Sequence, residues 1–256
     1  MTNWLCLGAK TQRWRSFVAL HCIQDKQKTL LRMKARRLAE SIGRMRKRSQ
    51  LLLVAVLAVV FALAPASPEE IGRLQKLMDW KAGQTIADVG AGAGEIGFAA
   101  AEAVGERGRV YLTELDEKKR KDLEEAVRVR GLKNVVVLQA VVKETNLPEG
   151  CCDGIVLRRV YHHLTSPAEM DASLLRSLKP SGELAVIDFP PRKWLSESDP
   201  VEGVPANRGG HGIPLKILVE ELKAAGFRIE KVVEDWPEDS YCVVARKEEA
   251  KKEVTR

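Results

Sequence analysis

The sequence predicts an α/β fold in which helices cover both faces of a mainly parallel sheet. Two observations support this prediction. From residue 69 onward, short apolar runs of strand length alternate with amphipathic stretches of helix length. The last two apolar runs are joined only by the short polar segment 234–240, which predicts an antiparallel pair rather than another crossover. We therefore expect one globular domain over residues 69–246 of the 256-residue chain, followed by a charged tail at 247–256.

The expected elements follow one another in a regular order. Apolar runs predict strands at 85–89, 109–114, 135–138, 154–157, 183–188, 228–233 and 241–245. Helical periodicity predicts helices at 69–80, 95–104, 116–130, 167–178 and 214–225, the last ended by Gly226. The charge run in the third helix predicts a solvated face with oppositely charged pairs. Residues 179–182 are expected to form a turn, and the Pro- and Gly-rich segment 190–214 a loop over the site.

The basic charge of the chain lies at its amino-terminal end. The whole chain carries +7, but residues 1–50 hold 13 Lys+Arg and 2 Asp+Glu, a net charge of +11, so the remainder is at −4. Phosphate neutralisation supplies most of the affinity of nucleic-acid binders, so an acidic domain argues against DNA or RNA as a partner. We expect residues 1–50 to be a disordered basic extension, or an extension created by a misplaced start codon.

Residues 45–66 predict export or membrane attachment. A basic stretch precedes the 14-residue apolar run 51–64, and small residues follow it, as in a secretory signal. A membrane span needs about 20 residues, so a signal peptide is favoured over an uncleaved anchor, and a buried core helix is the third alternative. By the positive-inside rule the domain would lie on the outer side of the membrane.

The cysteines indicate no metal site. They stand at positions 6, 22, 151, 152 and 242, without a C-x-x-C pair and without a histidine at ligand spacing. Cys151 and Cys152 are adjacent in a predicted turn, where a bridge between them would be strained. We expect free thiols and no bound metal.

A glycine loop at the end of the first strand indicates a ligand site. Gly90, Gly92 and Gly94 remove side chains where backbone N–H groups and the positive helix end would approach a carboxylate or phosphate. The loop alone does not identify the ligand. Together with Gly97 and an acidic Glu114 it also satisfies the G-x-G-x-x-G pattern of NAD-dependent oxidoreductases.

Asp88 separates these two interpretations. A carboxylate two residues before the first glycine suits a cationic group such as the ammonium of an amino acid, and it has no partner on a pyrophosphate. Its alternative role is a capping or turn carboxylate. Glu114 ends the second strand and can accept both hydroxyls of a ribose, which suits either cofactor.

Four segments follow one another at characteristic spacings. They are Ile-Ala-Asp-Val-Gly-Ala-Gly-Ala-Gly at 86–94, Gly-Arg-Val-Tyr-Leu-Thr-Glu-Leu-Asp at 108–116, Val-Tyr-His-His-Leu at 160–164 and Leu-Lys-Pro-Ser-Gly-Glu-Leu at 178–184. Together they resemble the class I S-adenosylmethionine (SAM) dependent methyltransferases, in particular bacterial type-11-like methyltransferase-domain proteins. The resemblance covers about residues 70–245. It implies a Rossmann-like seven-stranded sheet in the order 3-2-1-4-5-7-6, with SAM as the cofactor.

The resemblance also implies roles for individual residues. Asp88 and Gly90 would hold the methionyl part of SAM and Glu114 its ribose. Beside the adenine would lie Gln139, Ala140 and Val141. Two departures stand out, because the adenine position commonly carries an acidic residue and because Arg159 stands where members of the group often have Asp.

Catalytic candidates follow the fourth strand. Methyl transfer chiefly requires alignment, and a base is needed only when the acceptor is protonated. Tyr161, His162 and His163 are candidates to act as a base or to orient the acceptor, with capping and packing as the alternative. Since alternate strand residues face opposite ways, at most one histidine is expected to face the site. His211 lies in the glycine-rich loop, where it could close over substrate or, as the favoured alternative, only decorate the loop. Asp188 and the turn 189–191 could line the acceptor pocket or only end the strand.

The predicted function is therefore methyl transfer from SAM to a small-molecule acceptor. The alternatives are an NAD-type oxidoreductase and a non-catalytic SAM-binding domain tethered to a membrane. SAM is made in the cytosol, so a cytoplasmic location is the alternative to export. No segment indicates the identity of the acceptor or the oligomeric state.

Overall fold

The computed structural model describes residues 65–192, 202–208 and 211–247, which belong to one compact unit. The predicted basic extension, the apolar run 51–64 and nearly all of the charged tail lie outside these residues. Export and membrane attachment therefore stay predictions. Within the part that is described, no helix is long and apolar enough to cross a membrane.

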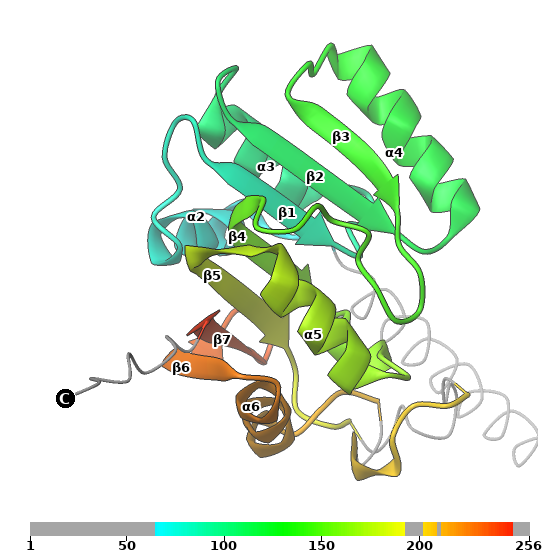
Figure 1. The fold of residues 1–256 in the computed structure, drawn as a ribbon, viewed down its shortest axis with the longest axis vertical. Helices are drawn as coiled ribbons and strands as arrows, with labels where there is room; N and C mark the ends of the chain where they lie inside the picture. The colour runs from blue at the N-terminus through cyan, green and yellow to red at the C-terminus, as the bar shows by residue number, and fades with distance from the viewer. Residues whose placement is uncertain (1–64, 193–201, 209–210, 248–256) are drawn as a thin grey trace, which may run out of the picture. The chain divides into compact units, whose positions relative to one another are not determined.

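Seven strands form one sheet in the predicted order β3-β2-β1-β4-β5-β7-β6 (Figure 1). The strands are β1 (Thr85–Val89), β2 (Arg109–Glu114), β3 (Val135–Gln139), β4 (Cys152–Arg158), β5 (Leu178–Asp188), β6 (Phe227–Trp236) and β7 (Ser240–Lys247). Strands β1 to β5 pair in parallel, whereas β7 runs antiparallel to β5 and β6. The predicted terminal hairpin is confirmed.

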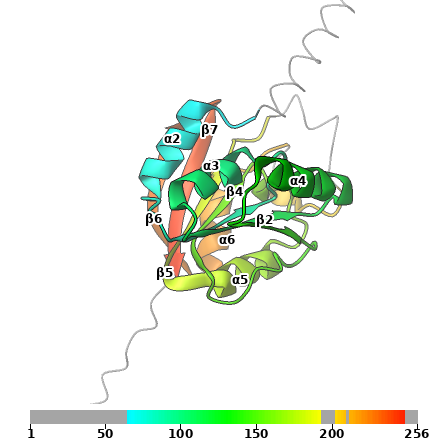
Figure 2. The same cartoon turned by 90° about the horizontal axis from the view of Figure 1, so that it is seen from above.

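Helices cover both faces of the sheet (Figure 2). They are α2 (Pro68–Leu77), α3 (Glu95–Val104), α4 (Glu117–Arg130), α5 (Pro167–Ser177) and α6 (Leu215–Ala224), with the short 3-10 helices η1 (Tyr161–His163) and η2 (Ala206–Arg208). Alternating side chains of β1 build the two core layers. Ile86 packs into the layer under α2, α3 and α4, while Ala87 packs into the layer under α5 and α6.

Helix α4 shows how local signals position an element that packs little. The carboxylate of Asp116 accepts a hydrogen bond from the Lys119 backbone at 2.8 Å and caps its start, and Gly131 ends it with a φ of +66°. Leu123 is its one buried residue. The predicted charged face is confirmed by ion pairs one turn apart, among them Lys118 with Asp122 and Lys121 with Glu117.

The segment around Cys152 differs from the prediction. Cys152 is not in a turn but begins β4 and is fully buried. It pairs with Leu178, whereas Gly154 pairs with Glu183, so residues 179–182 protrude from β5 as a bulge. The predicted turn is thus a bulge within a longer strand. The thiols of Cys151, Cys152 and Cys242 are free, as expected.

Glu70 joins three elements that are distant in the sequence. Its carboxylate is buried under α2 and accepts hydrogen bonds from Arg158 Nε at 2.9 Å and from Trp236 Nε1 at 3.0 Å. These contacts tie α2 to β4 and to β6. Burial removes hydration from the guanidinium and from the indole N–H, and the Glu70 carboxylate supplies a hydrogen bond to each of them in return.

We predict that Glu70→Ala lowers the free energy of unfolding by roughly 3 kcal/mol, since it leaves the Arg158 charge without its buried partner. Urea unfolding followed by circular dichroism measures the loss. Glu69→Ala, one residue earlier and exposed, is the matched control and should change stability by no more than about 0.5 kcal/mol. Equal losses in the two variants would contradict the structural role of Glu70.

Candidate active site

The predicted site residues converge on the carboxyl edge of the parallel strands. Strand β1 pairs with β2 on one side and with β4 on the other, with Asp88 opposite Leu112 and Val156. The chain order reverses direction at this point of the sheet, which is where open α/β sheets bind ligands. The glycine loop after β1, the end of β2 and the helix η1 after β4 therefore lie side by side (Figure 1).

Gly90, Gly92 and Gly94 share a positive φ but differ in what a side chain at each position would meet. All have positive φ, at +72°, +58° and +86° for Gly90, Gly92 and Gly94. A Cβ on Gly90 would lie 2.5 Å from Val160 Cγ2, and one on Gly94 would lie 2.7 Å from the Phe98 ring. A Cβ on Gly92 would meet no atom within 4 Å apart from its chain neighbours. Of the three, Gly92 is therefore the one that leaves open space for a ligand, while Gly90 and Gly94 are required by packing within the protein.

Asp88 belongs to β1, and its buried carboxyl contacts the first turn of α3. Its Oδ2 accepts a hydrogen bond from the Gly97 backbone N–H at 3.0 Å, so the capping role considered as an alternative is present. Burial raises the pKa of Asp88 to about 7, although the Gly97 hydrogen bond acts in the opposite direction. A cation placed beside this carboxyl would favour its ionised form.

Glu114 connects the glycine loop to the start of α4. Its Oε2 accepts from the Gly92 N–H at 3.1 Å, and its Oε1 accepts from the backbone N–H groups of Leu115 and Asp116 at 2.9 and 3.1 Å. A carboxylate offers about four lone-pair sites. Backbone groups use three of them, so binding both hydroxyls of a ribose would require Glu114 to exchange some of these bonds.

The predicted adenine side lies beyond β2 and β3. Gln139 is opposite Glu114 in the sheet, and the Ala140 N–H donates to the Glu114 carbonyl at 3.0 Å. Val141 is 43% exposed, and Leu115 is 55% exposed. Sequence reasoning missed Leu115, although an apolar residue directly after the acidic end of β2 was the available signal. Two exposed apolar side chains on adjacent strand ends form a surface suited to a flat base.

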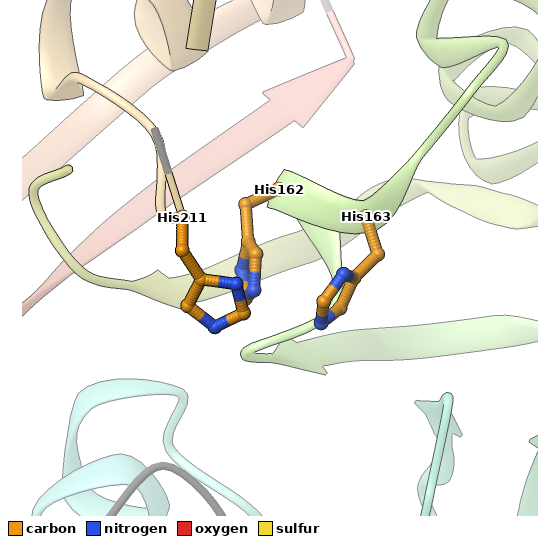
Figure 3. Close-up of side chains that lie close together, drawn as sticks. All are labelled: His162, His163 and His211. Carbon is orange, nitrogen blue, oxygen red and sulfur yellow. The ribbon is translucent and has the colours of Figure 1, made fainter. Parts of the chain in front are cut away.

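The structure gathers three histidines on the acceptor side. His162 and His163 have ring centroids 3.9 Å apart, and His211 lies 4.8 and 5.4 Å from them (Figure 3). The expectation that at most one of His162 and His163 faces the site is wrong. Residues 161–163 form a 3-10 helix rather than a strand, so neighbouring side chains do not point to opposite faces.

Asp188 orients His162. This carboxylate ends β5, is fully buried, and lies 2.8 and 3.1 Å from His162 Nδ1 through its two oxygens. It also accepts from the backbone N–H groups of His162 and Phe189. The sequence suggested that Asp188 lines the pocket, whereas its contacts show that it positions another side chain.

Tyr161 lies in the core rather than in the site. Its side chain is fully buried, and its hydroxyl donates to Asp171 Oδ2 at 2.7 Å. Burial raises the pKa of Tyr161 above its usual range and raises that of Asp171 to about 7. The candidate catalytic role of Tyr161 is therefore not supported, because its hydroxyl is directed into α5.

His211 is held by backbone contacts to the end of β5. The Arg192 N–H donates to the His211 carbonyl at 2.9 Å, and the Ile213 N–H donates to the Phe189 carbonyl at 3.0 Å. Gly212 sits between them with a φ of +112°, and a Cβ there would lie 2.8 Å from the Phe189 carbonyl oxygen. These contacts hold the His211 backbone to the end of β5, and closure over substrate stays a prediction beside the favoured alternative of loop decoration.

Comparison with known proteins identifies the family. Residues 81–225, more than half of the chain, match a family model described as a methyltransferase domain. The chain belongs to this family. The prediction of a class I SAM-dependent methyltransferase, with SAM as its cofactor, is confirmed at this level. The NAD-type oxidoreductase finds no support among these similarities.

Individual relatives agree with this assignment. The ubiquinone/menaquinone biosynthesis C-methyltransferases UbiE of Serratia proteamaculans and Escherichia fergusonii are 31% and 32% identical over 108 residues. These matches cover 42% of this chain and 43% of the relatives, so they span less than half the length of either protein.

Solved structures share the fold. A SAM-dependent methyltransferase from Aquifex aeolicus is 29% identical, with a TM-score of 0.58 over 70% of this chain and 93% of that one. YcgJ from Bacillus subtilis (16%, TM-score 0.56, 72% and 100% covered) and the [4+2]-cyclase SpnF (19%, TM-score 0.54, 69% and 81% covered) show likeness in fold alone.

We predict that Gly92→Ala weakens binding of S-adenosylhomocysteine at least about tenfold, because its methyl group enters the open space of the loop. Gly83→Ala is the matched control, since Gly83 also has positive φ and open surroundings but lies before β1. Both variants should lose roughly 1 kcal/mol of stability from backbone strain. Isothermal titration and thermal unfolding separate the two effects, and equal affinity in both variants would argue against a ligand at Gly92.

Proposed function

We propose that this protein transfers the methyl group of SAM to a small-molecule acceptor bound beside its histidine cluster, defined as His162, His163 and His211. One observation carries the proposal. The glycine loop packs directly on Val160, so closely that a Cβ on Gly90 would overlap its side chain. Because Val160 stands two residues before His162, the cofactor loop and the cluster are neighbours on one edge of the sheet.

The residues at the loop fit SAM as the ligand. The buried Asp88 carboxyl would accept the ammonium of the methionyl group, and the space at Gly92 would admit the chain of the cofactor. Glu114 would bind the ribose, with Ala140 and Val141 beside the adenine. SAM supplies a methyl group already activated as a sulfonium, so the protein's task is to align the acceptor and exclude water.

On the acceptor side the histidines are the residues available for chemistry. Because Nδ1 of His162 is hydrogen-bonded to Asp188, Nε2 is the ring nitrogen that would contact a substrate. His163 and His211 both have solvent-accessible side chains and complete that side of the site. An acceptor that carries a hydroxyl would lose its proton to such a group, whereas an acceptor already nucleophilic at neutral pH needs only alignment.

Two observations support a small acceptor rather than a macromolecule. The UbiE relatives are named for methylation in quinone biosynthesis, which is chemistry on small molecules. The chain after residue 50 is acidic, and nucleic-acid binding favours a basic surface. The [4+2]-cyclase SpnF has the same fold, so the fold alone does not establish methyl transfer and the reaction itself has to be assayed.

A transfer assay tests the proposal. The purified protein is incubated with SAM labelled in its methyl group and with an extract of the cells that produce it, separated into small molecules, protein and nucleic acid. We expect S-adenosylhomocysteine to form together with a labelled small molecule heavier by one methylene unit in mass spectrometry. Label confined to a macromolecule, or bound SAM without any transfer, would overturn the proposal and favour a different acceptor or the non-catalytic alternative.

We predict that affinity for S-adenosylhomocysteine falls as the pH decreases below about 7. In the free protein the raised pKa of Asp88 leaves the carboxyl largely protonated under those conditions, and a neutral carboxyl attracts the ligand ammonium less. Binding shifts Asp88 to its ionised form and releases a proton, so affinity should change by up to about tenfold per pH unit. Titration calorimetry between about pH 5.5 and 8, in buffers of different ionisation enthalpy, measures both quantities.

Asp88→Asn is the matched variant for this prediction. The amide keeps the size of the side chain but cannot ionise, so binding should weaken at pH 8 and lose its dependence on pH. Wild-type affinity that stays constant over this range, or proton uptake on binding, would contradict the assignment of Asp88 to the ammonium.

A further inference from the structure

We propose that the histidine cluster is a binding site for a divalent transition-metal ion of the zinc class. One ring nitrogen from each of the three histidines lies within 4.8 Å of the others (Figure 3). The sequence indicates no metal site, because its cysteines lack the spacing of metal ligands and His211 is far along the chain from His163. The fold brings the three together at the ends of β4 and β5.

The buried imidazole of His162 provides the second observation. Its side chain is only 3% exposed, and its Nε2 has no hydrogen-bond partner among the described residues. A buried polar nitrogen without a partner is costly, and natural structures tolerate it chiefly where a ligand, water or ion completes it. The His162 ring that carries this Nε2 packs against the rings of both His163 and His211.

Asp188 supplies the outer shell that such a site requires. Metal-bound histidines characteristically donate their second ring N–H to a carboxylate, which fixes the tautomer and makes the ligating nitrogen more basic. The Asp188 oxygens at 2.8 and 3.1 Å from Nδ1 occupy this position. Two backbone N–H groups hold Asp188 in turn, so the orientation of His162 is determined before any ion binds.

The geometry is close to that of a three-histidine zinc site. Two nitrogens bound to one tetrahedral zinc ion lie about 3.3 Å apart, given Zn–N bonds of about 2.0–2.1 Å. The observed spread of up to 4.8 Å means that ion binding requires the ligand nitrogens to approach one another by about 1.5 Å, through movement of His163 and His211. His162 is locked and would serve as the fixed point of the site.

The donor set determines the class of ion. Three imidazoles with no carboxylate in direct reach suit zinc, iron, nickel or copper, whereas magnesium and calcium need oxygen ligands. Two guanidinium groups lie near the cluster, since Arg159 and Arg192 both stack on the Phe189 ring that packs against His162 and His211. Arg159 forms an ion pair with Glu238, and Asp188 contributes one buried negative charge. Three protein ligands leave a coordination position open, as in catalytic zinc sites.

The role of the ion rests on the proposed function, and in that role the ion replaces a free imidazole as the group that activates an acceptor hydroxyl. An ion with an open position beside the cofactor loop would bind a hydroxyl or carbonyl oxygen of the acceptor and hold it in place. This restricts the acceptor to molecules with an oxygen donor near the methylated atom. The binding of the ion itself does not depend on methyl transfer and is tested separately.

Metal titration of the full chain tests the site. Protein purified without a histidine tag is treated with a chelator, dialysed and titrated with zinc chloride by calorimetry, with bound zinc counted by mass spectrometry. We expect one zinc ion per chain. His163→Ala and His211→Ala should each weaken binding at least about 100-fold, and Asp188→Asn by roughly 10- to 100-fold. Binding of cobalt in place of zinc should give the visible absorption bands of a tetrahedral ion.

Two controls identify the ligands. His21→Ala removes the remaining histidine of the chain, and Cys151→Ser removes a half-buried thiol that could bind zinc, so both should leave zinc binding unchanged. S-adenosylhomocysteine binding shows that the His163 and His211 variants are folded. No zinc binding by the wild type, binding that survives both ligand variants, or binding lost with Cys151 would each overturn the site. Zinc binding without methyl transfer would instead refute the proposed function alone.

Discussion

The parallel pairing of β1 with its two neighbours is the constraint on which the site depends. Because the paired strands run in one direction, every residue that follows β1, β2 or β4 emerges at the same edge. The close packing of Gly90 on Val160 then fixes how near the loop after β1 lies to the helix after β4. A side chain at position 90 would push the two apart and separate the cofactor loop from the histidines.

Two buried aspartates at this edge serve different purposes because their partners differ. Asp188 accepts from two backbone N–H groups and faces an imidazole, so its contacts are directed within the protein. Asp88 accepts from a backbone N–H in the first turn of α3, and burial raises its pKa to about 7. A carboxyl in that state responds strongly to an added cation. Asp188 therefore orients His162, whereas the buried state of Asp88 motivates the proposal that it binds a charged ligand.

The elements that depend on local pattern could be predicted from the sequence. Apolar periodicity placed β1, β2 and α3 at their observed bounds, and the short polar link before β7 predicted the antiparallel hairpin. The bulge at 179–182 was taken for a turn because Lys-Pro-Ser-Gly has turn composition, and only the register against β4 shows that the strand continues.

The acceptor side was harder to predict because it depends on contacts between distant residues. Nothing in Val-Tyr-His-His-Leu indicates that the segment forms a 3-10 helix, which buries Tyr161 and brings both histidines to one side. Nothing near His211 indicates that backbone hydrogen bonds hold it to the end of β5. Asp188 gave only the signal of a polar residue ending a strand, and its function appears when His162 is placed beside it.

The proposed cofactor side and the proposed acceptor side of the site are built in different ways. The proposed cofactor side is built from one continuous loop and two strand ends, so its geometry follows from local chain conformation and sheet pairing. The acceptor side combines η1 with the segment at His211, and both are anchored on β5, by Asp188 and by the Phe189 carbonyl. A fold that also occurs in a cyclase must distinguish its reactions through such residues rather than through the sheet. We therefore propose that in this chain the choice of acceptor depends on the residues at the ends of β4 and β5, where three imidazoles meet.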